Sequence, residues 1–148
     1  MNMSNSYVYF AFQGDNFDPN IVTTELGISP TDSWRTGEPG KYIQQQKYSC
    51  WQLKSTSHEL LDIDKLVNEV VSQLSEKIEL INNLKQRLNL DTTLSIVMYI
   101  NINEEQSTPY LGHNSEVISF LHRTGTTTDV DIYRYNSRTN EHASQQAL

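Results

Sequence analysis

Cysteine, glycine and proline are scarce in this sequence of 148 residues, with one cysteine (Cys50), six glycines and four prolines. A single cysteine excludes an intrachain disulfide, argues against a structural zinc site and agrees with a reducing compartment. No stretch approaches the roughly 18 consecutive apolar residues of a membrane-spanning helix. The start, "MNMSNSYVYFAF", lacks the basic residues and long apolar run of a signal peptide. We therefore expect a soluble, cytoplasmic protein without a membrane partner.

Positive charge is also sparse, because 11 Lys and Arg stand against 18 Asp and Glu, giving a formal net charge of −7 at pH 7. The basic residues are scattered, whereas binding to phosphate groups needs lysines and arginines that release counterions. We therefore expect no nucleic-acid partner. The acidic composition suits either simple solubility or binding to a basic protein.

Recognisable catalytic and cofactor motifs are missing. No two of the four histidines have the i, i+3 or i, i+4 spacing that places two metal ligands on one helical face. Asp129 and Asp131 alternate onto one face of an expected strand, but the stretch lacks the further ligands and the glycine turn of a calcium loop. No glycine-rich phosphate loop and no nucleophile elbow occurs. The sequence therefore predicts no catalytic residue, metal or cofactor, and a protein that is not an enzyme.

Apolar periodicity and turn residues predict a mixed order of strands and helices. Asp18 and Pro19 mark the start of the first helix, and Gly27 marks its end. The expected elements, in order, are a strand over 6–14, a short helix over 18–26, a short strand near 33–36, a strand around 50–53, a helical region over 58–90, a strand over 93–102, a short helix over 114–125 and a strand over 126–135.

The helical region over 58–90 carries apolar residues at spacings of three and four, without proline or glycine. It is either one long helix or two helices broken near Ser75, which could cap the second. We predict an α+β domain over residues 1–136, with a mainly antiparallel sheet and this long helical segment and two short helices packed against it. A polar tail is expected over residues 137–148.

The stretch "LGISPTDSWRTGEP" places Trp34 beside Arg35 among turn residues. An exposed Trp–Arg pair would be a natural binding anchor, because both residue types are enriched at interface hot spots. The alternative is a structural corner, in which Trp34 is buried at the end of the sheet and Arg35 pairs with Asp32 or Glu38. Cys50, beside Trp51 in an expected strand, is predicted to be a buried and inert thiol.

The ordered set of landmarks resembles the domain of unknown function 4279 family of bacterial proteins, over about residues 7–135. The resemblance implies a small bacterial cytoplasmic α+β domain, and it brings no established reaction, cofactor or catalytic residue. The matching residues are Gly14, Asp18, Pro19, Leu26, Gly27, Pro30, Trp34, Gly37, Glu38, Trp51, Asp131, Ile132 and Tyr133.

Our leading hypothesis is a non-enzymatic binding protein, and more specifically an immunity or antitoxin-like protein that neutralises a basic toxin domain. The expected partner-binding residues are Asp32, Trp34, Arg35, Glu38, Asp129 and Asp131.

A second hypothesis is an enzyme or ligand sensor with a pocket near Trp34, Arg35 and His122, to which Trp51 and Asp131 would contribute. A third is an oligomerisation module, in which the helical region packs against a second copy.

Overall fold

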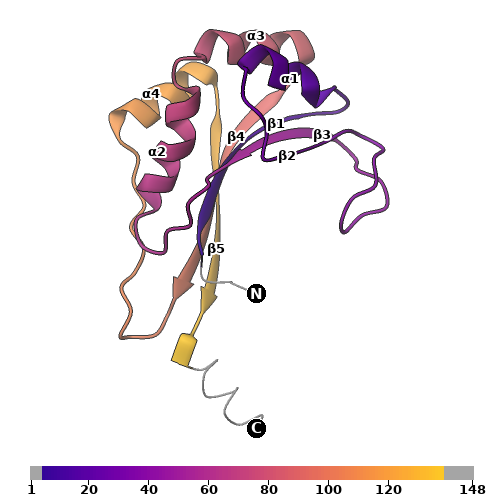
Figure 1. Cartoon of the computed structure of the whole chain (residues 1–148). Coiled ribbons are helices and arrows are strands. Elements are labelled where there is room, and N and C mark those ends of the chain that lie inside the picture. Colours follow the sequence, from indigo (N-terminus) through magenta and orange to yellow (C-terminus); the bar gives the residue numbers. More distant parts are fainter. Residues whose placement is uncertain (1–4, 139–148) are drawn as a thin grey trace.

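A five-stranded sheet with the strand order β2-β3-β1-β4-β5 forms the centre of the protein, as seen in a computed structural model that describes residues 5–138 (Figure 1). The strands are β1 (Tyr7–Gly14), β2 (Asp32–Trp34), β3 (Ser49–Lys54), β4 (Asp91–Asn101) and β5 (Thr127–Tyr135). The helices are α1 (Pro19–Leu26), α2 (Ile63–Leu74), α3 (Ile78–Leu88) and α4 (Ser115–Thr124).

The sheet is mostly antiparallel, which confirms the predicted α+β class. β1 pairs antiparallel with both β3 and β4, and β2 pairs antiparallel with β3. Among the strands of residues 5–138, β5 alone is parallel to its neighbour, β4. Parallel strands need a crossover connection, and α4 lies in the segment that joins these two. The sequence did not predict this parallel pair. β5 is a long strand at the edge of the sheet.

The predicted helical region over 58–90 consists of two helices, not one long helix. α2 ends at Leu74, where Ser75 is its C-terminal cap, and the backbone N–H of Lys77 donates to the Leu74 carbonyl at 2.9 Å. Ser75 therefore closes the first helix and does not cap the second, because α3 begins after Lys77 without a side-chain cap. The turn allows the apolar side of α2 to face β1 while α3 lies against α1 and α4.

The hydrophobic core lies between the helices and one face of the sheet. Alternation along β1 directs Val8, Phe10 and Phe12 to this face, and each side chain is fully buried. Phe12 meets the Trp51 ring edge-on at 5.6 Å between ring centroids. The indole N–H of Trp51 donates to the Thr23 hydroxyl oxygen at 3.0 Å, so this buried polar group is satisfied. In Figure 1, α2 and α4 lie to the left of the sheet and α1 and α3 above it.

The expected tail over 137–148 lies almost wholly outside the described residues. Within residues 5–138, none of the helices has the length and apolar content needed to span a membrane.

Candidate functional site

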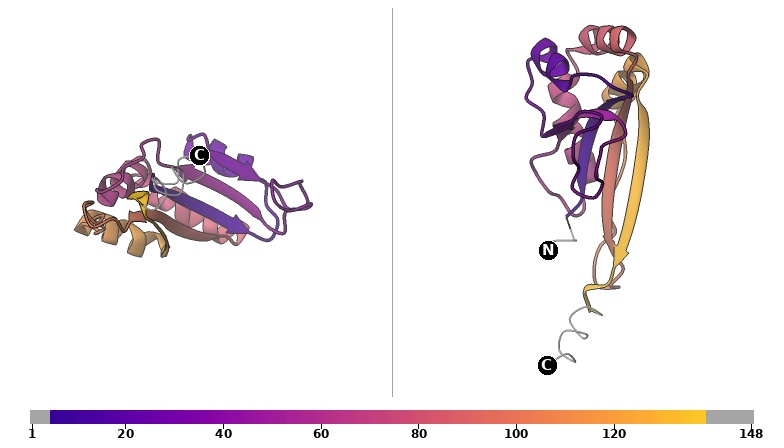
Figure 2. Two further views of the ribbon diagram at one scale, coloured as in Figure 1. Left: turned by 90° about the horizontal axis from the view of Figure 1, so that it is seen from below. Right: turned by 90° about the vertical axis from the view of Figure 1, so that its right-hand side faces the viewer.

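The face of the sheet opposite to the helices carries aromatic side chains that are not part of the hydrophobic core. The right-hand view of Figure 2 looks at the sheet from the side away from α2 and α4. Within the described residues, no helix packs on this side, and we call it the open face. Strand alternation and register place four small or apolar residues on this face that are at most 5% exposed, Ala11, Cys50, Ser95 and Val97. The larger polar and aromatic residues on the same face are Asp32, Trp34, Gln52, Lys54, Tyr7, Tyr9, Tyr99, Asn101, Asp129, Asp131, Tyr133 and Tyr135.

Of the five tyrosines on the open face, four lie in two stacked pairs, and we call Tyr7, Tyr9, Tyr99 and Tyr133 the tyrosine cluster. The rings of Tyr7 and Tyr9 are stacked with centroids 6.3 Å apart. The rings of Tyr99 and Tyr133, from the parallel pair β4 and β5, are stacked at 5.2 Å. Tyr133 is 52% exposed, so the cluster reaches solvent. Large apolar rings that also carry a hydrogen-bonding hydroxyl are typical of protein-binding surfaces.

Charged groups lie close to the tyrosine cluster. The Lys54 ammonium stands over the Tyr7 ring at 3.9 Å from the centroid, within range of a cation–π interaction. Burial raises the pKa of Tyr7 above its ordinary value, and the neighbouring tyrosines and the Asp131 carboxylate raise it further. The Tyr7 hydroxyl therefore keeps its proton at neutral pH and is available as a hydrogen-bond donor or acceptor.

Trp34 lies on the open face at the sheet edge, half-buried, and its ring meets that of Tyr48 edge-on at 5.8 Å. Its indole N–H is buried and has no hydrogen-bond partner among the described residues. The exposed Arg35 follows in the next loop, where its Nε donates to Asn16 Oδ1 at 3.2 Å. The expected pairing of Arg35 with an acidic neighbour is therefore replaced by this contact, and Trp34 is neither fully exposed nor a closed corner of the core.

The six expected partner-binding residues form two separate groups. Asp32 and Trp34 lie on β2, and Asp129 and Asp131 lie on β5, at the two opposite edges of the sheet. Four strand spacings separate these edges, which is about 19 Å. The remaining two, Arg35 and Glu38, are exposed in the segment after β2. Asp129 and Asp131 lie beside the tyrosine cluster, whereas the register places Asp32 and Trp34 level with Ala11 and Gln13, further along β1 from Tyr7.

Sequence reasoning missed the tyrosine cluster itself. The signal was present in "YVYF", where Tyr7 and Tyr9 alternate with Val8 and Phe10. Strict alternation of tyrosine with fully apolar residues predicts one covered and one uncovered face.

The expected pocket near Trp34, Arg35 and His122 is not assembled. His122 lies exposed in the last turn of α4, whereas Trp34 belongs to β2, and these elements lie at opposite sides of the sheet (Figure 1). Trp51 is fully buried on the helix-covered face, away from Trp34 on the open face.

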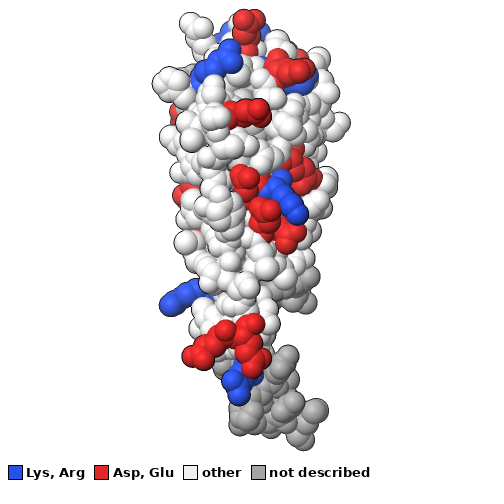
Figure 3. Space-filling view, turned by 90° about the vertical axis from the view of Figure 1, so that its left-hand side faces the viewer, with Lys and Arg blue, Asp and Glu red and all other residues white. Residues whose placement is uncertain are grey.

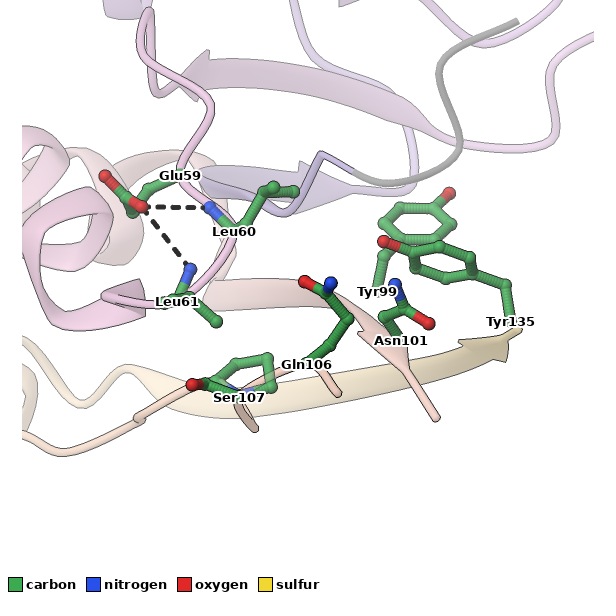
Figure 4. A pocket seen from close by; sticks show the side chains of 9 residues that line it. Glu59, Leu60, Leu61, Tyr99, Asn101, Gln106, Ser107 and Tyr135 are labelled. Carbon is green, nitrogen blue, oxygen red and sulfur yellow. Dashed lines mark hydrogen bonds between the residues drawn. The ribbon is translucent and has the colours of Figure 1, made fainter. Parts of the chain in front are cut away.

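A cavity of about 170 Å³ adjoins the tyrosine cluster at the carboxyl ends of β4 and β5 (Figure 4). The Glu59 carboxylate turns toward the backbone there, accepting hydrogen bonds from the N–H groups of Leu60 and Leu61 at 3.1 and 3.4 Å. Among residues 5–138, no Lys, Arg or His lines the cavity, so these residues offer no counter-charge to a phosphate or carboxylate ligand. The lining residues are Glu59, Leu60, Leu61, Tyr99, Asn101, Gln106, Ser107, Pro109 and Tyr135.

Opposite the open face, the side on which α2 and α4 lie carries acidic groups along its length, with Lys and Arg standing singly beside them (Figure 3). The described residues on this side therefore present no basic patch to a polyanion. Among residues 5–138, no three His, Cys, Asp or Glu side chains gather as metal ligands.

Cys50 lies in β3 beneath the open face and is fully buried. Burial raises the pKa of its thiol from 9.0 to about 12, so the reactive thiolate is almost absent at neutral pH. This agrees with the prediction of an inert thiol.

We expect native Cys50 to react with a thiol reagent at about pH 8 at least about 100-fold more slowly than the unfolded chain.

Stability should also depend on pH, because the folded state holds the thiol proton of Cys50 more tightly than the unfolded state. The contribution of the protonated Cys50 thiol to the free energy of unfolding is fully present below pH 9 and is lost as the pH rises toward 12. Urea unfolding should give a free energy of unfolding at about pH 10.5 that is about 1–2 kcal/mol lower than at about pH 8. A Cys50→Ala variant that declines as steeply would contradict this assignment.

The model of the family described as "Domain of unknown function (DUF4279)" matches residues 4–135. No curated protein and no solved structure matches the chain.

Proposed function

We propose that this chain, which belongs to the family described as Domain of unknown function (DUF4279), is a non-enzymatic binding protein. Its surface indicates that it binds a basic protein partner on the open face. The observation that carries the proposal is the tyrosine cluster with Asp129 and Asp131 beside it on β5. Tyrosine and tryptophan are the residue types that dominate binding energy at protein interfaces. The carboxylates would steer a basic partner toward these rings.

The charges of the open face support a basic partner. Asp129 and Asp131 are both exposed and lie on the same face as Tyr133. Lys54 is engaged over the Tyr7 ring. The formal net charge of −7 adds a long-range attraction for a positively charged protein. A role as an immunity or antitoxin-like protein, in which the partner is a basic toxin domain, fits this charge and the small size of the chain.

Co-purification of the tagged full chain from its own cells, in low and in high salt, tests the proposal. We expect one stoichiometric basic protein in low salt and its loss in high salt, since rim charges act through a screened potential. The double variant Asp129→Asn, Asp131→Asn should retain less of this protein than the wild type does.

The matched control is the double variant Glu104→Gln, Glu105→Gln, which removes the same charge from an exposed loop outside the open face. It should retain the partner as the wild type does. Equal losses in both double variants would show that net charge, and not the open face, drives binding. An empty preparation from the wild type would overturn the proposal.

A further inference from the structure

The outer edge of β5 is the least protected part of the sheet. β5 (Thr127–Tyr135) is the last strand in the order, and every residue from 127 to 134 is exposed. Its outer backbone N–H and C=O groups have no neighbouring strand among the described residues. Val130 and Ile132 are 39% and 57% exposed on the side opposite to the aspartates. A long edge strand with exposed apolar side chains is a template for pairing with another strand.

Charge restricts how two copies of β5 can pair. A two-fold axis perpendicular to the sheet makes the strands antiparallel and keeps both open faces on the same side. A register centred on Asp131 places the two Asp131 carboxylates directly opposite each other. A register centred on Val130 places Asp129 of one copy opposite Asp131 of the other. Both registers are disfavoured, because like charges directly opposite each other are destabilising.

A register centred on Ile132 avoids both conflicts. It pairs residues 129–135 of one copy with 135–129 of the other, so that Asp131 faces Tyr133 and Asp129 faces Tyr135. Each carboxylate then lies opposite a phenol hydroxyl, which is a suitable donor. On the other side Ile132 meets its own copy at the axis, and Val130 meets the aliphatic stem of Arg134.

We propose that this chain forms a homodimer in which two β5 strands pair antiparallel about Ile132, joining the two sheets into one. The occupant of the β5 edge is therefore a second copy of the chain, selected by the alternation of aspartate and tyrosine along the strand. The open faces of the two copies become continuous, and each Asp129 and Asp131 near the junction lies opposite a tyrosine of the other copy. The dimer does not depend on the proposed function, since the purified chain alone forms it.

Sedimentation of the purified full chain at about 100 µM tests the dimer, a concentration suited to a small interface of micromolar affinity. We expect the wild type to sediment as a dimer and Ile132→Lys as a monomer, because two ammonium groups would oppose each other at the axis. Ile118→Lys is the matched control, because Ile118 on α4 is 56% exposed and lies away from β5. It should remain a dimer.

Cysteine cross-linking tests the register separately. Ile132→Cys should form a covalent dimer on mild oxidation, since directly opposite residues bring their Cβ atoms to about 5 Å. Val130→Cys should not, because the register holds the two copies of residue 130 four residues apart along the strands, about 14 Å. The native Cys50 is fully buried and adds no background.

A wild type that sediments as a monomer at about 100 µM would overturn the proposal. A dimer that persists in Ile132→Lys would place the interface elsewhere and overturn it as well. Cross-linking of Val130→Cys without cross-linking of Ile132→Cys would overturn the register. Circular dichroism of each variant separates these outcomes from misfolding.

Discussion

Replacing Phe10 with alanine should lower the free energy of unfolding by about 3–5 kcal/mol, the range for a large aromatic ring removed from a closed core. Phe10 is fully buried, with ring centroids of Phe12 and Phe120 at 5.4 and 5.9 Å. The lost ring leaves a cavity between β1 and α4, which surrounding side chains fill only in part. Urea unfolding followed by circular dichroism measures the effect.

The neighbouring Tyr9 is the matched control for this change. Tyr9→Ala removes an aromatic ring from the same strand but from the open face, where the ring stacks on Tyr7. We expect a loss of about 1 kcal/mol. Equal losses for Phe10→Ala and Tyr9→Ala would show that both faces of β1 are enclosed, and would remove the open face on which the proposed function rests.

Removing the Tyr133 ring should weaken binding of the partner at least about 30-fold, the effect of losing a hot-spot side chain worth about 2 kcal/mol. Tyr133 lies at the exposed side of the tyrosine cluster, stacked on Tyr99 and next to the β5 aspartates. Isothermal titration of the partner into Tyr133→Ala and into the wild type measures the change.

Tyr42→Ala is the control for Tyr133→Ala. Tyr42 is 91% exposed in the loop between β2 and β3, outside the open face. Its removal should leave the partner affinity within about twofold of the wild type. Sedimentation of Tyr133→Ala alone distinguishes a loss of partner contact from a change in self-association. An unchanged affinity for Tyr133→Ala would contradict the assignment of the tyrosine cluster as the binding surface.

Local sequence signals predicted most of the individual elements. The Asp18 side chain accepts a hydrogen bond from the backbone N–H of Asn20, and Gly27 ends the helix in the left-handed conformation with φ of 68°. A left-handed cap strongly favours glycine because it has no Cβ. Alternation along the last strand separated Asp129 and Asp131 from Val130 and Ile132, as the register confirms.

Pairing between distant segments was beyond the reach of these local signals. The parallel alignment of β4 and β5 depends on how α4 crosses between them, and neither strand's own residues specify its direction. The break after Leu74 was one of the two alternatives that the sequence left open, because the apolar periodicity continues through the turn. Propensity and periodicity are local, whereas the turn is fixed by what α3 packs against.

The site was predicted only in part for the same reason. Asp32, Trp34, Asp129 and Asp131 share one face, but only the strand order shows that the first two lie at one edge and the last two at the other. The tyrosines of the cluster come from β1, β4 and β5, and β1 is far from the other two along the chain. Without the order of strands, their meeting on one surface could not be inferred.

Hydroxyl-radical footprinting of the tyrosines, with and without the bound partner, tests the central claim most directly. The account predicts that Tyr99 and Tyr133 lose reactivity in the complex, together with Tyr7. Tyr42 and Tyr110, exposed at 91% and 64% outside the open face, should keep theirs. Protection of Tyr42 and Tyr110 with an unprotected tyrosine cluster would contradict the claim that the open face is the binding surface.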